Sequence, residues 1–195
     1  MGVNNMERYI CTKSANSNFA CSCEKCFQDF MESLDKTCLV SENKMRIYRE
    51  WSMPNKKTFT IKPIKELLER VMPAYQNSDI CLDPFPFEYS KDATDYLNEK
   101  QDDCYYNAVF DPPYSPRQLK EVYKGKGEYD TKASTWSNWK DLLSKKIKKG
   151  GIVISFGWSS QGMGKNRGFK IEEILLVAHG GNHNDTICVV ERKIE

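Results

Sequence analysis

Four consecutive residues, Asp111-Pro112-Pro113-Tyr114, have the side chains best suited to chemistry in this chain. One substrate that such residues could act on is the exocyclic amine of adenine. Its nitrogen is a poor nucleophile because the lone pair is delocalised into the ring, so a catalyst must localise that pair and direct it at a methyl donor. The Asp111 carboxylate and the Pro112 carbonyl can accept the two amino hydrogens, and Tyr114 can stack on the base. A strand that ends in a proline-stiffened turn explains the same residues without any chemistry, so the tetrapeptide alone leaves both interpretations open.

The elements that must position this motif follow from the spacing of the apolar residues. Short apolar runs alternate with helical patterns, and the motif follows directly on one of the runs. The pattern predicts strands at 80–82, 105–110, 152–156, 174–178 and 186–190, helices at 63–72 and 136–147, and a short helix at 92–97. Gly150-Gly151 is the expected stop after the second long helix. We therefore expect an α/β fold with an open, mostly parallel sheet and an antiparallel C-terminal hairpin, in which ligands bind at the carboxyl ends of the strands.

We expect Asp111 to lie at a solvent-facing strand end, outside the core. His179 and His183 flank the expected hairpin turn, where hydrogen bonds to nearby groups are a commoner role for histidine than ligation. Cys81, Cys104 and Cys188 sit in or beside apolar runs and are expected to be small core residues.

Residues 1–45 are polar and rich in cysteine, and we interpret them as a small N-terminal cap on a domain of residues 46–195. The two-residue gap in Cys23-Glu24-Lys25-Cys26 places two sulfurs within reach of one metal. Four of five thiols could hold one structural zinc, and unligated thiols are the alternative. The five candidates are Cys11, Cys21, Cys23, Cys26 and Cys38.

The charge balance limits the kind of nucleic-acid-binding surface that the protein can have. Lys and Arg number 29 against 27 Asp and Glu, so any nucleic-acid surface must be a local patch. Candidate DNA contacts are Arg117 and Lys120 beside the motif and Lys165 and Arg167 in a glycine-rich loop, with ordinary solvated loops as the alternative.

No apolar run approaches the ~20 residues of a membrane helix, and the start lacks a signal core. We expect a soluble cytoplasmic protein without a membrane partner, and the sequence does not predict its oligomeric state.

The run from Asn107 to Gln118, NAVFDPPYSPRQ, resembles the small, single-domain adenine-specific DNA methyltransferases of phages and prophages. The resemblance extends from about Tyr48 to the C-terminus and includes Met53–Pro63, Asp83-Pro84-Phe85, Asp92–Leu97 and the tail from Gly150 to Glu191. It implies a Rossmann-like class I methyltransferase fold that transfers a methyl group from S-adenosylmethionine to the N6 amine of an adenine flipped out of DNA. It also implies a cofactor site at Lys62, Pro63, Asp83, Pro84, Phe85 and Asp92, and a base site at Asp111 to Tyr114.

The segment after Phe85 departs from the pattern of these enzymes. They usually continue with small residues, a helix and a second strand that ends in an acid for the ribose, whereas here Pro86 and Phe87 follow and Asp92 comes soon after. We therefore expect a shortened sheet and weak binding of S-adenosylmethionine, with a dissociation constant well above ~10 μM. The alternative is a methyltransferase fold that has lost its cofactor site and serves as a nucleic-acid-binding or decoy module.

Overall fold

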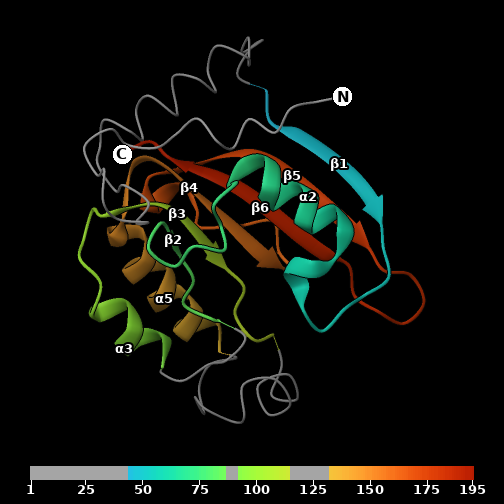
Figure 1. Ribbon diagram of the computed structural model, residues 1–195, viewed down its shortest axis with the longest axis horizontal. Coiled ribbons are helices and arrows are strands. Elements are labelled where there is room, and N and C mark those ends of the chain that lie inside the picture. The colour runs from blue at the N-terminus through green and yellow to red at the C-terminus, as the bar shows by residue number, and fades with distance from the viewer. Residues whose placement is uncertain (1–43, 87–91, 115–131) are drawn as a thin grey trace, which may run out of the picture. The chain divides into compact units, whose positions relative to one another are not determined.

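The computed structural model describes residues 44–86, 92–114 and 132–195 (Figure 1). The chain divides into two compact units, Met1–Asn43 and Lys44–Glu195, and the second unit contains all of the described residues. The cysteine-rich cap, with its five candidate zinc ligands, lies outside the described residues. Within those residues, no helix is both long and apolar enough to span a bilayer.

One six-stranded sheet forms the centre of this unit. Five strands run in the same direction and only β6 is reversed, so β6 pairs antiparallel with both of its neighbours. The prediction of an α/β protein with a mostly parallel sheet and an antiparallel C-terminal hairpin is confirmed, and the arrangement is compatible with a Rossmann-like fold. In spatial order the strands are β1 (Arg46–Trp51), β5 (Phe169–Ala178), β6 (Thr186–Lys193), β4 (Ile147–Gly157), β3 (Tyr105–Phe110) and β2 (Cys81–Leu82).

Helices cover both faces of the sheet (Figure 1). Helix α2 (Lys62–Val71) buries Ile64, Leu67 and Leu68 in a cluster that includes Val109 of β3 and Ile154 of β4. The neighbouring strand residues Phe110 and Val153 belong to a second cluster, with Trp139 of helix α5 (Ala133–Lys146) and Leu97 of helix α3 (Ala93–Asn98). Since successive strand residues point to opposite faces, α2 lies on one face and α3 and α5 on the other.

The expected helix stop at Gly150-Gly151 is wrong. Helix α5 ends at Lys146 and β4 begins at Ile147 without a loop, so both glycines lie inside the strand. Gly150 has φ +84°, and the register between β3 and β4 shifts at this point, which is the geometry of a β-bulge. A Cβ on Gly151 would lie 2.7 Å from the Ile147 side chain, so the bulge requires glycine there.

Strand β1 is an edge strand that the sequence did not predict. It pairs parallel with β5, and all six of its residues are exposed. Because the strand contributes no buried side chain, it lacks the apolar signature of the other strands.

The buried Cys81 and Cys188 confirm two of the three expected core cysteines. Cys104 is exposed, just before β3, so the prediction for this residue was wrong.

Candidate functional site

Three strands bring their carboxyl ends to one edge of the sheet. Strands β2, β3 and β4 are parallel neighbours, so the residues that follow them lie side by side. These are Asp83 after β2, Asp111 directly after β3 and Trp158 directly after β4. Because β2 and β3 are paired, Asp83 and Asp111 follow neighbouring strand ends, and the negative charge of Asp111 contributes to raising the pKa of Asp83.

Asp111 is buried, with 8% of its surface exposed, which corrects the expectation of a solvent-facing residue. Burial raises the pKa of its carboxyl, although hydrogen bonds from Tyr114 and Thr58 act in the opposite direction. The Tyr114 hydroxyl donates to Asp111 Oδ1 at 2.5 Å. Thr58 comes from the short helix η2 (Thr58–Thr60), which immediately precedes α2. The carboxylate is therefore held between two hydroxyl groups at the sheet edge.

The Tyr114 ring belongs to an aromatic cluster. The indole of Trp158 stacks on it, with 5.6 Å between ring centroids and 27° between planes, and Trp136 meets it edge-on at 5.8 Å. A Cβ on Gly157 would lie only 3.1 Å from Tyr114 Cε1, so the ring lies close against the backbone at the end of β4. The residues after β3 thus combine a hydrogen-bond acceptor with a flat aromatic surface.

Asp83 occupies the equivalent place on the neighbouring strand. Its carboxylate accepts the backbone N–H of Phe85 at 2.9 Å, and burial, with a smaller effect of Asp111, raises its pKa to about 7. Pro84 and Phe85 are themselves buried. The Phe85 ring contacts Phe110 and Trp139, at centroid distances of 5.3 and 5.0 Å. Phe85 is therefore part of the core, and its predicted contact with a cofactor stays a prediction.

Asp92 has a structural role as the N-cap of α3, where its side chain accepts the Thr94 N–H at 2.8 Å. The Thr94 hydroxyl in turn accepts the indole N–H of Trp139 at 3.0 Å. These contacts join α3 to α5 on the face that also holds Phe85. A cofactor contact of Asp92 is an untested prediction.

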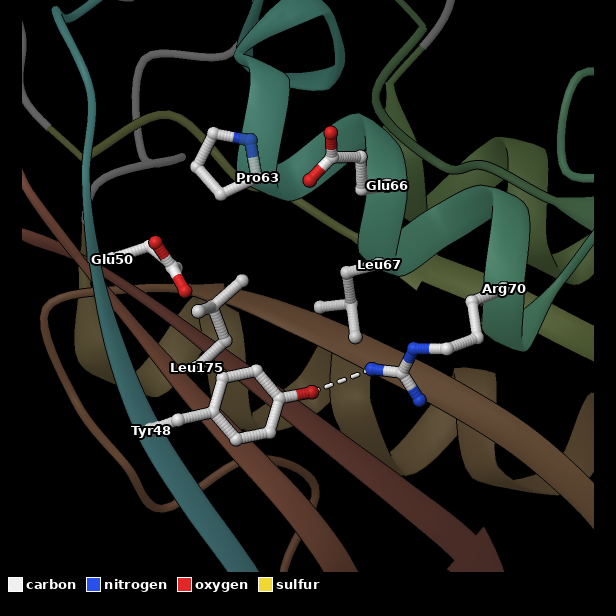
Figure 2. Close-up of a pocket in the computed structure, with 7 residues that line it drawn as sticks. All are labelled: Tyr48, Glu50, Pro63, Glu66, Leu67, Arg70 and Leu175. Carbon is white, nitrogen blue, oxygen red and sulfur yellow. Dashed lines mark hydrogen bonds between the residues drawn. The ribbon is translucent and has the colours of Figure 1, made fainter.

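Lys62 and Pro63 begin α2, and Pro63 lines a pocket that neither Asp83 nor Asp111 lines. The Lys62 side chain is 83% exposed and lies 4.0 Å from Glu66. Pro63 lines a pocket of about 220 Å³ between α2 and β1, together with Tyr48, Glu50, Glu66, Leu67, Arg70 and Leu175 (Figure 2). Beside it, the buried Glu173 carboxylate is paired with Arg70 and Arg46 and accepts a hydrogen bond from Tyr48. Lys62 and Pro63 follow η2 closely along the chain, and Thr58 of η2 donates a hydrogen bond to Asp111. The described residues therefore connect them to the Asp111 site through the chain.

Of the four predicted DNA contacts, Arg117 and Lys120 lie outside the described residues. Lys165 is exposed in the short helix η3 (Lys165–Arg167). Arg167, whose side chain is 13% exposed, donates to Asp141, to the Met163 carbonyl and to Ser137. These contacts give Arg167 a structural role, and its contact with DNA stays a prediction.

Several residues of the site and its surroundings were not identified from the sequence. Thr58 and Trp158 lie far from Asp111 and Tyr114 along the chain, so no local pattern indicated the contacts. The buried Glu191 anchors the glycine-rich loop by accepting the N–H groups of Met163 and Gly164. His179 binds the Ser52 carbonyl and the Thr186 hydroxyl through its two ring nitrogens, as expected for a structural histidine.

Comparison with known proteins found no protein-family model that matches this chain and no similar curated protein. Within residues 44–86, 92–114 and 132–195, no group of three or more His, Cys, Asp or Glu side chains could hold a metal ion. The zinc prediction concerns cysteines outside these ranges.

Proposed function

We propose that this protein transfers the methyl group of S-adenosylmethionine to the N6 amine of adenine in DNA. The observation that carries the proposal is the buried Asp111 carboxyl at the carboxyl end of β3, hydrogen-bonded to Tyr114. The sequence resemblance implies a base site at Asp111 to Tyr114, which includes both of these residues. The mixed sheet is compatible with the fold that the resemblance implies.

The residues of the chain would act on the base, which is the nucleophile, and not on the leaving group, which belongs to the cofactor. Asp111 and the Pro112 carbonyl accept the two amino hydrogens, which localises the nitrogen lone pair and orients it. Burial of both prolines holds the Pro112 carbonyl at a fixed angle to the carboxylate. The Tyr114 hydroxyl holds Asp111 in place in the free protein, and a bound amine replaces it as a donor. A duplex base reaches these groups only when it is flipped out.

The cofactor would supply an activated methyl group on a sulfonium, and the described residues fit it in part. A carboxyl at the end of strand β2 is present as Asp83, next to the base site. Strand β2 has only two residues, and among the described residues no strand lies beyond it to supply an acid for the ribose hydroxyls. This combination supports binding that is weak compared with an enzyme that has the complete sheet.

Methyl transfer to DNA by the full-length protein and by Asp111→Asn tests the proposal. Tritiated S-adenosylmethionine and genomic DNA of mixed sequence are suitable because the target sequence is unknown. We expect Asp111→Asn to lose at least ~100-fold in rate, since an amide nitrogen in place of one acceptor oxygen repels the amine. Asn replaces the buried Asp with little change in volume, whereas Ala would leave a cavity. The exposed Asp79→Asn is the matched control.

The pH dependence gives a second readout of the same residue. Because burial raises the pKa of Asp111, its carboxyl takes up a proton at a higher pH than an exposed aspartate does. A protonated carboxyl is a poorer acceptor for the amine, so we expect the rate to fall as the pH is lowered. An Asp111→Asn rate equal to that of the wild type would exclude the carboxylate from the mechanism.

A second candidate function is a nucleic-acid-binding module without cofactor chemistry. The two-residue β2 favours it, because the part of the sheet that would hold the ribose is missing from the described residues. The two candidates differ in one measurement. The second one predicts DNA binding with no detectable binding of S-adenosylmethionine at millimolar concentration, with or without DNA.

A further inference from the structure

Trp158 has an unusual combination of exposure and contact. The residue is 56% exposed, yet its indole stacks on the Tyr114 ring at the candidate base site. The hydroxyl of the same tyrosine donates to Asp111. The two groups that would hold a nucleobase, the ring face and the carboxylate, therefore each have a partner from within the protein.

The distance between the rings excludes a base from the space between them. Two aromatic planes in contact lie about 3.5 Å apart, so a base between Tyr114 and Trp158 would need about 7 Å. The centroids are 5.6 Å apart. A base that stacks on this face of Tyr114 must therefore replace the indole of Trp158.

Of the described groups that contact the Tyr114 ring, Trp158 is the one that can leave at least cost. The Gly157 backbone belongs to β4, and Trp136 is half-buried in α5 against the core. Trp158 follows the last residue of β4 and is next to the exposed Ser159 and Ser160. Moving the indole into solvent gives up about half of a side chain's burial and one aromatic contact.

We propose that Trp158 is a placeholder for the target base: it covers the Tyr114 ring in the free protein, and an unpaired adenine displaces it. This inference rests on the proposed function, since it assumes that the Tyr114 ring binds a base. It goes further by naming the residue that competes with the substrate and by predicting the sign of its effect. A residue that only lines the site would strengthen binding, whereas a placeholder weakens it.

Binding of single-stranded oligonucleotides to the full-length protein tests this without the cofactor and without knowledge of the target sequence. The probes are fluorescein-labelled (dA)12 and (dT)12, with dissociation constants measured by anisotropy. We expect Trp158→Ala to bind (dA)12 about two- to tenfold more tightly than the wild type, the range that loss of one competing aromatic pair gives. Trp158→Phe keeps a smaller ring and should gain less. Trp51→Ala removes an exposed tryptophan of β1 and should change nothing.

Tryptophan emission provides the second readout. Addition of unlabelled (dA)12 to the wild type should make one tryptophan more accessible to acrylamide, and this change should be absent in Trp158→Phe. Together with tighter binding by Trp158→Ala, that result supports the placeholder.

Unchanged or weaker binding of (dA)12 by Trp158→Ala overturns the placeholder and leaves methyl transfer as proposed. Absence of (dA)12 binding by every variant overturns the placeholder together with the base site. Binding with displacement of Trp158, in a protein that transfers no methyl group, supports the placeholder and refutes the proposed activity alone.

Discussion

Replacement of Asp83 by Asn tests the electrostatics of the sheet edge. Burial raises the pKa of this carboxyl from 3.8 to about 7, with an added contribution from Asp111. Between these two pH values the folded protein holds a proton that the unfolded chain has released. The free energy of unfolding therefore falls as the pH rises from about 4 to about 7 and then levels off.

The size of the effect follows from the two pKa values. At about 1.4 kcal/mol per pH unit, the interval from 3.8 to about 7 corresponds to an upper limit of about 4 kcal/mol. Asparagine is neutral at every pH and keeps an oxygen that can accept the Phe85 N–H. We expect Asp83→Asn to match the wild type near pH 4 and to exceed its stability by up to ~4 kcal/mol at pH 8.

Urea unfolding of the full-length protein at several pH values, followed by tryptophan fluorescence, measures this difference. Asp111 also has a raised pKa, so the wild-type curve contains more than one contribution. The difference between the two curves isolates Asp83 and its coupling to Asp111. The exposed Asp79→Asn is the control and should follow the wild type. Parallel curves for Asp83→Asn and the wild type would refute the burial of a coupled carboxyl at this edge.

Three further predictions concern the cofactor, the metal and one loop. Calorimetry should give a dissociation constant for S-adenosylmethionine well above ~10 μM, and tighter binding would mean that another segment completes the site. Metal analysis should find about one zinc per chain, and five thiols that titrate freely in the native protein would contradict this. Gly162→Ala should lower the free energy of unfolding in urea more than Gly181→Ala does. Gly181→Ala should cost ~1 kcal/mol, from the left-handed backbone conformation alone. Both glycines have φ between +55° and +58°, but only at Gly162 does a Cβ meet the Glu191 carboxylate. Equal costs would show that this carboxylate moves aside.

The strand that carries the motif could be predicted to the residue. Tyr105–Phe110 is an apolar run between a polar turn and Asp-Pro-Pro, so both of its ends are marked in the sequence. Helix α2 was equally clear, because Pro63 marks its start and its apolar residues recur at helical spacing. These local signals were enough to place Asp111 at a strand end.

The surroundings of the motif could not be predicted, because the contacts are distant along the chain. Trp158 lies 44 residues beyond Tyr114 and reaches it only because β4 pairs with β3. Thr58 contributes its hydrogen bond from the segment before α2. The burial of Asp111 follows from these neighbours, so the strand end considered alone predicted an exposed residue. Strand β1 was missed for the opposite reason, because an edge strand with six exposed residues has no apolar pattern.

A buried carboxyl, Asp111, next to a half-buried one, Asp83, at neighbouring strand ends is a cost that the fold alone does not require. Elsewhere in the described residues the buried acids have cationic neighbours: Glu173 is paired with two arginines, and Lys140 and Arg167 act against the burial that raises the pKa of Glu191. Asp83 and Asp111 instead accept one backbone N–H and two hydroxyl groups respectively, and within the described residues no cation lowers the pKa that burial raises. Apolar residues at these positions would avoid that cost. Perturbed carboxyls beside an aromatic surface, at the edge where α/β sheets bind ligands, are the arrangement expected where stability is given up for a binding site.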